Sequence, residues 1–386
     1  GFAPDKNEAM WDQKLCESIA TLSKPGTTFA TYSSAGFVKR NLEGAGFHVT
    51  KSKGYGQKRH MLSGRFTPLT TINRKAAWTF PWDSTSQVPM GTGRKIAIIG
   101  GGIAGCATAH ALARRGFTVD LLEKNTEIAS GTSGNPRGIV HLNPAQRLTP
   151  AMRFRFNAYL YALRHYNSLS AGADFSWRPD GIIRQARTQE EIDSQKALVH
   201  RQLYDEMQVL PVDTNSANDL ADFSLGFPGI YFPGAGSLDP TALCQAWTKH
   251  KSVQLLTSHE VLDFKRKTNR WFVTLLANGE KVTAEYDILV ICNNIDASKI
   301  SRLPEYPFAY NHGQTDTFTL PETIKFPATP ICNKGYLIPW KRDNKCMLTI
   351  GGSYAQGRHQ SNSSKLLAQK NLSLLEKLVP ALHKNM

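Results

Sequence analysis

Apolar residues recur at helical spacing near the start of the chain, and short strand-like runs follow. Leu15, Ile19 and Leu22 lie on one face of a helix expected over residues 10–23, which a Pro-Gly turn ends. Runs rich in β-branched and aromatic residues predict strands beyond it, and a second apolar pattern predicts a helix. These elements are strands at 27–32, 47–51 and 59–66 and a helix at 35–43. Their order is typical of the closing half of an α/β domain.

Residues 68–93 have no hydrophobic periodicity and separate this first part from the rest. They carry three prolines and many Ser and Thr residues, a composition typical of a linker. From residue 94 a strand, a glycine turn and a helix begin a new domain, and we expect strands and helices to alternate to the end of the chain. The sequence thus predicts one domain at residues 1–67 and another at 94–386.

The second domain opens with a dinucleotide-binding pattern. The apolar strand at residues 96–99 runs directly into Gly100-Gly101-Gly102-Ile103-Ala104-Gly105, and a helix is expected over residues 106–115. Gly100 permits the tight turn, Gly102 lets the backbone approach a pyrophosphate, and Gly105 lets helix and strand pack closely. The helix N-terminus, with the amides of Ile103 and Ala104, then faces the phosphate charge.

An acidic residue and a loop rich in hydroxyl groups extend this pattern. A strand at residues 117–122 ends at Glu123, followed by Lys124, where an acid accepts hydrogen bonds from the adenosine ribose. The loop at residues 130–138 can wrap a second phosphate and a ribityl chain, which favours FAD over NAD, although a surface turn is the alternative. Its candidate cofactor contacts are Ser130, Gly131, Thr132, Ser133, Gly134 and Asn135.

Composition limits the class of protein. The chain has 386 residues, of which 41% are hydrophobic and 20% charged, as in folded globular proteins with two or three domains. Its six cysteines show no metal-ligand spacing, so we expect reduced thiols, no metal site and a cytoplasmic location. We expect no transmembrane segment, no signal peptide and a monomer. The chain begins Gly-Phe-Ala, and we expect both of its ends to be cut.

The net charge of +15 adds a polyanion to the expected partners. From Gly36 to Lys75 there are nine Lys or Arg residues against one acid, Glu43, with an aromatic residue and glycines interleaved. This composition suits phosphate contacts and structured RNA, although a solvated basic face is the alternative. The candidate RNA contacts are Lys51, Lys53, Lys58 and Arg59.

Residues 94–386 resemble the D-amino-acid oxidase and glycine oxidase group of flavoproteins. The likeness is carried by the glycine turn, the acid, the 130–138 loop and the segments at 236–240, 261–273, 287–294, 312–314, 335–339 and 350–354. It implies an FAD-binding Rossmann-type domain with an inserted mixed-sheet substrate domain. It also implies that the main chain at Val261 holds the adenine. The family's last flavin-contacting segment has no counterpart before Met386.

Residues 1–67 resemble the C-terminal part of a Rossmann-like methyltransferase domain. In bifunctional bacterial enzymes that modify the wobble uridine of tRNA, such a domain precedes a flavin domain of this kind. The resemblance implies FAD-dependent removal of the carboxymethyl group from carboxymethylaminomethyl-(2-thio)uridine, followed by methylation with S-adenosylmethionine. The strands and glycine loop that would bind S-adenosylmethionine have no counterpart here, so we do not expect this chain alone to transfer methyl groups.

Oxidation of an N-substituted glycine requires above all a cation for the substrate carboxylate. Arginine binds carboxylates through paired hydrogen bonds, and the candidates are Arg137, Arg184 and Arg342, with Tyr336 as a pocket hydroxyl. Surface or phosphate-contacting roles are the alternative for each arginine. Two other functions stay open: an FAD-dependent oxidase of glycine, sarcosine or proline, and an RNA-binding remnant without flavin.

Overall fold

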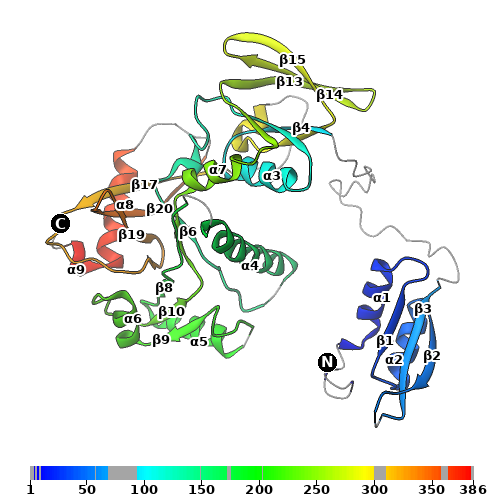
Figure 1. Ribbon diagram of the computed structural model, residues 1–386. Helices are drawn as coiled ribbons and strands as arrows, with labels where there is room; N and C mark the ends of the chain where they lie inside the picture. Colours follow the sequence, from blue (N-terminus) through cyan, green and yellow to red (C-terminus); the bar gives the residue numbers. More distant parts are fainter. Residues whose placement is uncertain are drawn as a thin grey trace. The chain divides into compact units, whose positions relative to one another are not determined.

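The computed structural model of the chain consists of two compact units, Gly1–Pro89 and Met90–Met386 (Figure 1). It describes residues 4, 7, 10–56, 58–67, 94–147, 149–171, 175–201, 203–299, 310–357 and 364–383. The linker predicted at residues 68–93 lies outside these described residues. None of the described helices is long and apolar enough to cross a membrane.

The first unit is an antiparallel three-stranded sheet, in the order β1-β3-β2, with two helices. Cys16 and Ala20 of the first helix and Val38 and Leu42 of the second are buried against strand residues such as Leu62, and together they form one core. Each predicted element is present within a few residues of its expected bounds. The elements are α1 (Gln13–Leu22), β1 (Thr28–Thr31), α2 (Gly36–Gly44), β2 (Phe47–Lys53) and β3 (His60–Phe66).

The second unit contains a Rossmann-type sheet of four parallel strands in the order β12-β5-β4-β16. Its central strands are buried on both faces, as expected for a parallel sheet that other elements cover on each side. Figure 1 shows α3 and α7 packed side by side on this sheet. The elements are β4 (Lys95–Ile99), α3 (Ile103–Ala113), β5 (Thr118–Leu122), α7 (Pro240–Thr248), β12 (Val253–Leu256) and β16 (Ile288–Ile291).

Two expectations for this unit were wrong. The helix after the glycine turn begins at Ile103 rather than at Cys106, because Gly102 already serves as its N-cap. Strands and helices also do not alternate throughout, most clearly after β12, where three antiparallel strands form a meander: β13 (His259–Lys267), β14 (Arg270–Ala277) and β15 (Glu280–Tyr286). The hairpin turns contain Asn269 and Asn278 with positive φ, which lets short loops join antiparallel strands.

A mixed seven-stranded sheet forms the other part of the second unit, in the order β17-β20-β19-β18-β8-β10-β9. Residues of α6, α8 and α9 form a core with one face of the sheet, and residues of α4 and α5 with the other. The strands are β8 (Ile182–Gln185), β9 (Leu210–Val212), β10 (Gly229–Phe232), β17 (Asn311–Leu320), β18 (Ile331–Cys332), β19 (Tyr336–Arg342) and β20 (Lys345–Gln356).

The connections complete this inserted arrangement, which confirms the predicted fold class. A small antiparallel sheet, β6-β11-β7, stands where the chain passes between the Rossmann-type part and the mixed sheet. The remaining elements are η2 (Thr132–Gly134), β6 (Gly138–Val140), α4 (Pro150–Ser170), β7 (Trp177–Arg178), α5 (Gln189–His200), α6 (Thr214–Ala221), β11 (Gly236–Leu238), η3 (Asn294–Lys299), α8 (Lys365–Leu378) and α9 (Pro380–His383).

Candidate functional site

The glycine turn between β4 and α3 brings the chain into close self-contact. Gly100 has φ +104°, and a Cβ on Gly105 would lie 1.9 Å from the carbonyl oxygen of Gly100. A side chain at position 105 would therefore push the helix off the strand. The Gly100 N–H donates to the carbonyl of Leu122 at 2.8 Å, which ties the turn to the end of β5.

The N-terminus of α3 presents backbone donors at this turn. The first hydrogen bond within the helix runs from the Cys106 N–H to the Gly102 carbonyl, so the amides of residues 103–105 have no partner within the helix. The Ile103 N–H donates to Ser133 Oγ at 2.9 Å. The Ala104 and Gly105 amides, together with the helix dipole, are suited to an anionic group.

Glu123 lies at the end of β5 with 7% of its surface exposed. Its Oε2 accepts the Gly101 N–H at 2.7 Å, and its Oε1 accepts the Asn125 N–H at 2.9 Å and Asn125 Nδ2 at 2.7 Å. A carboxylate has about four acceptor positions, so it can still accept from a ligand hydroxyl. Lys124 instead forms an ion pair with Asp296 at 2.6 Å, and that hydrogen bond raises the pKa of Lys124.

The loop at residues 130–138 connects the turn to the mixed sheet. Ser130 Oγ donates to the Glu127 carbonyl, Ser133 accepts from α3, and Asn135 Oδ1 accepts from Thr315 Oγ1 at 3.3 Å. Gly134 packs tightly, because a Cβ there would lie 2.4 Å from the Ala129 carbonyl oxygen. Gly131 and Thr132 are exposed. The loop therefore spans the gap between dinucleotide turn and mixed sheet.

Val261 lies in β13, whose first residue is tied to the acid of the turn. The His259 N–H donates to the Glu123 carbonyl at 2.8 Å. The ladder between β13 and β14 shifts register between Val261 and Asp263. Such a β-bulge leaves one residue out of the ladder, and its backbone groups can then meet a ligand. The adenine role of Val261 stays a prediction.

Strand register brings distant residues into one row across the mixed sheet. Arg184 of β8 pairs with Cys332, Cys332 with Tyr336, Tyr336 with Gly351, and Gly351 with Thr315 of β17. We call these five residues the cross-sheet row. Adjacent strands lie about 4.8 Å apart, so Arg184 and Tyr336 are about 10 Å apart along the row. Its Thr315 end touches the 130–138 loop.

Tyr336 extends over Gly351 toward that loop. A Cβ on Gly351 would lie 2.3 Å from the Tyr336 hydroxyl oxygen, so the glycine provides the space that the ring occupies. Burial, followed by the neighbouring Tyr354 and Cys332, raises the pKa of Tyr336 to about 12. The phenol is therefore protonated at neutral pH and able to donate a hydrogen bond.

Arg184 is half-buried at the other end of the row. Its Nη1 donates to Asn143 Oδ1 at 3.1 Å, and none of the ion pairs between described residues includes Arg184. Burial, followed by the charge of Arg184, lowers the pKa of His141 to about 4. Burial also raises the pKa of Cys332 to about 12, so neither neighbour adds charge at neutral pH. The Arg184 guanidinium thus keeps N–H donors that can bind an anion.

The other two arginine candidates have surroundings unlike those of Arg184. Arg137 has 5% of its surface exposed, stacks 4.9 Å above the Trp340 ring and donates to the carbonyl and hydroxyl of Ser176. Burial lowers the pKa of Arg137. Arg342 is exposed at the hairpin end of β19. It lies six residues from Tyr336, or about 20 Å along the strand.

The RNA-contact candidates gather at one end of the first unit. Lys51 and Lys53 lie on β2, Lys58 and Arg59 lie just before β3, and all four are exposed. The connection is compact, with the Gly54 N–H donating to the Arg59 carbonyl at 3.3 Å. Lys58 Nζ lies 4.6 Å from the centroid of the Tyr32 ring, and nearby Tyr55 is 95% exposed.

A family model described as FAD dependent oxidoreductase matches residues 95–386, which is most of the chain. The chain belongs to this family of FAD dependent oxidoreductases. A second model, described as S-adenosyl-L-methionine-dependent methyltransferase, matches residues 1–67. The family of the second unit thus accounts for the dinucleotide turn, and the first unit is related to a different class of enzyme.

Curated relatives align with nearly the whole chain, across both matched regions. A protein of Chromobacterium violaceum named tRNA 5-methylaminomethyl-2-thiouridine biosynthesis bifunctional protein MnmC is 32% identical over 385 residues, which are 99% of this chain and 56% of that protein. The protein of the same name from Stutzerimonas stutzeri is 32% identical over 388 residues, 100% of this chain and 56% of its own length. The chain therefore spans about half the length of these relatives.

Solved structures share the fold of this FAD dependent oxidoreductase. Glycine oxidase from Geobacillus kaustophilus is similar with a TM-score of 0.63 and 21% identity, covering 75% of this chain and 80% of that one. L-proline dehydrogenase from P. horikoshii has a TM-score of 0.62 and 20% identity, covering 75% and 78%. At such identities the likeness establishes the fold and leaves the substrate open.

The residues around the turn fit the FAD of this family. Two helix amides can donate hydrogen bonds to a phosphate, and the buried Glu123 carboxylate can accept a hydrogen bond from a ribose hydroxyl. A buried acceptor, Oδ1 of Asn293, has no hydrogen-bond partner among the described residues, and Asn293 lies against Gly100. The helix amides and the buried acid are the groups that the dinucleotide fold uses for pyrophosphate and ribose, and the unpaired Asn293 oxygen is a further polar atom beside them.

Sequence reasoning missed three members of the cross-sheet row: Cys332, Gly351 and Thr315. Cys332 and Thr315 lie in no motif, and Gly351 entered only as part of the 350–354 segment of the resemblance, because strand register alone brings these residues to Arg184 and Tyr336. One signal was available. Gly351 and Gly352 stand together inside a strand pattern, and glycine there often marks a bulge or a close approach.

Proposed function

We propose that this chain is the flavin-dependent part of a bifunctional tRNA-modifying enzyme. It would remove the carboxymethyl group from carboxymethylaminomethyl-(2-thio)uridine at the wobble position and leave aminomethyl-uridine. The observation that carries this proposal is one chain in which a methyltransferase match precedes a flavin oxidoreductase match, as in its bifunctional relatives. We also propose that the protein is cytoplasmic and acts on tRNA as a monomer.

The chemistry suits the family. The amides at the start of α3 and Glu123 would hold FAD, which would supply a hydride acceptor for the methylene carbon between the amine and the carboxylate. Water then hydrolyses the carbon–nitrogen double bond, which gives the primary amine on the uridine and glyoxylate. The secondary amine must be neutral, so that its lone pair can form the carbon–nitrogen double bond as the hydride leaves the methylene carbon. The protein therefore needs few acid–base groups and one well-placed cation for the carboxylate.

Arg184 and Tyr336 fit the groups of this substrate. The guanidinium of Arg184 forms no ion pair with a described residue and binds the carboxylate through two parallel hydrogen bonds. The protonated hydroxyl of Tyr336 donates a hydrogen bond and orients the substrate between Arg184 and the 130–138 loop. Asn135, held by Thr315, fixes the loop against the sheet.

The first unit would contribute to RNA binding. Lys51, Lys53, Lys58 and Arg59 are exposed together, and their charges suit the phosphates of a folded RNA. The methyltransferase domain, of which residues 1–67 are the C-terminal part, would then methylate the aminomethyl group with S-adenosylmethionine. Each of these roles rests on the match to the bifunctional relatives.

A second candidate function is the oxidation of a free amino acid such as glycine, sarcosine or proline. The shared fold of glycine oxidase and L-proline dehydrogenase favours it. The basic first unit weighs against it, because a small substrate does not need a cationic surface of that size.

The test is to incubate the chain and FAD with tRNA that carries carboxymethylaminomethyl-uridine. Nucleoside mass spectrometry is expected to show loss of the carboxymethyl mass and gain of aminomethyl-uridine, with one glyoxylate per base converted. Free glycine, sarcosine and proline serve as competing substrates. Unchanged tRNA with bound flavin, together with rapid oxidation of a free amino acid, would overturn the proposal.

A further inference from the structure

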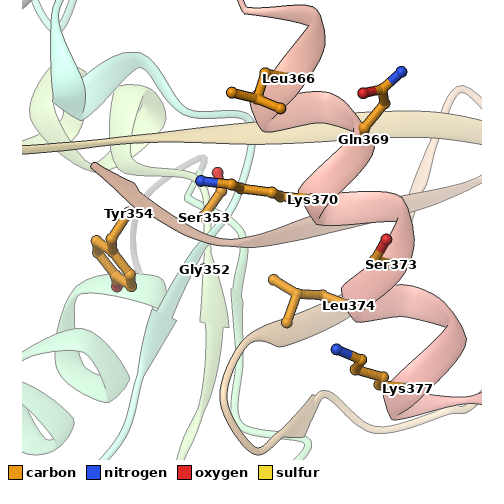
Figure 2. Close-up of a pocket in the computed structure, with 9 residues that line it drawn as sticks. All are labelled: Gly352, Ser353, Tyr354, Leu366, Gln369, Lys370, Ser373, Leu374 and Lys377. Atoms are coloured by element: carbon orange, nitrogen blue, oxygen red, sulfur yellow. The ribbon is translucent and has the colours of Figure 1, made fainter.

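A hollow opens between the end of β20 and α8, outside the dinucleotide turn and the cross-sheet row. Figure 2 shows Gly352, Ser353 and Tyr354 on the strand side and helix residues on the other side. Its volume is about 350 Å³. The helix residues that line it are Leu366, Gln369, Lys370, Ser373, Leu374 and Lys377.

The aromatic side chain at this hollow is open to solvent. Tyr354 is 71% exposed and pairs with Gly313 of β17. It also lies near the cross-sheet row, because it stands on β20 three residues from Gly351. An exposed aromatic ring therefore stands at the edge of the proposed substrate site, free to stack on a planar group.

The charge of the hollow has one sign. Lys370 and Lys377 line it, and no acidic residue does. The acid of α8, Glu376, is exposed next to Lys377 but is not among the lining residues. Figure 2 shows Lys370 extending from the helix toward Ser353, on the side where Tyr354 lies. A hollow lined by two ammonium groups and an aromatic ring has the combination with which proteins bind single-stranded nucleic acid.

We propose that this hollow binds the nucleotides that flank the reacting uridine, with Tyr354 stacking on a base and Lys370 and Lys377 contacting phosphates. The inference rests on the proposed function, because the substrate must then be a base held in RNA. It adds a second contact surface on the flavin-binding unit, apart from the basic end of the first unit. A free amino acid has neither a base nor phosphates to occupy it.

The experiment measures binding of an anticodon stem-loop RNA that carries 2-aminopurine next to the wobble uridine. The variants are Tyr354→Ala, Tyr354→Phe and the double variant Lys370→Gln, Lys377→Gln. The matched control is Lys341→Gln, Lys345→Gln, which removes two exposed lysines at the other end of the β19–β20 hairpin. Lys345 lies nine residues from Tyr354 on β20, or about 30 Å along the strand.

Tyr354→Ala is expected to weaken binding about tenfold and to relieve the quenching of 2-aminopurine, whereas Tyr354→Phe keeps both. The Lys370, Lys377 double variant is expected to lower the slope of log K against log salt by about 1.5, because two phosphate contacts are lost. The Lys341, Lys345 control is expected to leave the quenching unchanged. All altered side chains are exposed, and thermal unfolding curves check that each variant is folded.

Failure of this inference differs from failure of the proposed function. Suppose that Tyr354→Ala and the lysine double variant bind the RNA normally, quench 2-aminopurine fully and still oxidise the tRNA base. This result would overturn the hollow as an RNA-binding surface and would leave the proposed function standing. Absence of RNA binding by the unaltered chain would overturn both. The inference would also be overturned if the chain bound an acidic peptide more tightly than the RNA and the lysine double variant lost that peptide binding.

Discussion

The dinucleotide turn and the cross-sheet row are built in different ways. The turn takes its contacts from a short stretch, residues 100–105, with Glu123 brought beside it by the next strand. The row takes five residues from five strands that span residues 184–351, and only hydrogen-bonding register places them together. The first site is local in sequence, and the second exists only in the folded sheet.

This difference separates two kinds of chemical demand. Phosphate binding needs backbone amides and a helix N-terminus, which a glycine motif supplies at any place in a protein. Recognition of a carboxylate beside a reacting carbon needs one cation and one hydroxyl at a set spacing, which a sheet provides through its strand distance. Cofactor binding and substrate choice can therefore change independently in this fold.

The largest expected effect is on the row, from Arg184→Met. Loss of the carboxylate partner is expected to lower kcat/KM for carboxymethylaminomethyl-uridine tRNA about 100- to 1000-fold, because a charged hydrogen-bonded pair of this kind contributes about 3–4 kcal/mol. Arg184→Lys is expected to restore part of the rate. The measurement is glyoxylate release against tRNA concentration. If Arg184→Met kept the original kcat/KM, Arg184 would not be the residue that binds the substrate carboxylate.

The turn is tested by Gly105→Ala. Its methyl group would meet the Gly100 carbonyl oxygen, so the variant is expected to lose about 1–3 kcal/mol of unfolding free energy and to retain less flavin. Urea unfolding and the visible flavin absorbance measure these changes. The matched control for the unfolding free energy is Gly131→Ala, where no atom lies within 4 Å of the added Cβ. Equal losses of unfolding free energy in the two variants would contradict the close packing.

Gly351→Ala tests whether the row positions Tyr336. The added methyl would displace the phenol ring, so this variant and Tyr336→Phe are each expected to lower kcat/KM about tenfold, the cost of roughly one hydrogen bond. The double variant is expected to match the single ones, since both remove the same contact. Flavin content should stay unchanged. Additive losses in the double variant would mean that Gly351 acts elsewhere.

The row also predicts a pH dependence through His141. Its pKa of about 4 in the folded protein lies below its ordinary 6.5, so the unfolded chain binds the proton first and stability is lost as pH falls from 6.5 toward 4. Between pH 7 and pH 6 the loss from this group is about 0.7 kcal/mol. Urea unfolding of the original chain and of His141→Gln measures the difference. An identical pH slope in both would contradict it.

The sequence predicted the turn because each of its requirements is local. Glycines, an apolar strand and an acid at the end of the next strand are visible without knowing any distant contact. The row could be predicted only in part. Arg184 and Tyr336 were selected by residue type, whereas Cys332 and Thr315 lie in no motif. The paired residues of the row are up to 148 positions apart in the sequence. Arg342, equally suitable by type, could not be separated from Arg184 before the register was known.

A substitution at Arg342 is therefore expected to have the smallest effect on activity. It is also the sharpest check on whether the cross-sheet row is the substrate site. It stands opposite Lys345 at the solvent-exposed hairpin, about 20 Å from Tyr336 along β19, too far for a bound carboxylate to reach both. Arg342→Gln is expected to leave kcat/KM within twofold and the unfolding free energy within about 0.5 kcal/mol. The same glyoxylate assay measures it beside Arg184→Met. If Arg342→Gln lost more activity than Arg184→Met, the carboxylate would bind at the hairpin end, and the cross-sheet row would not be the substrate site.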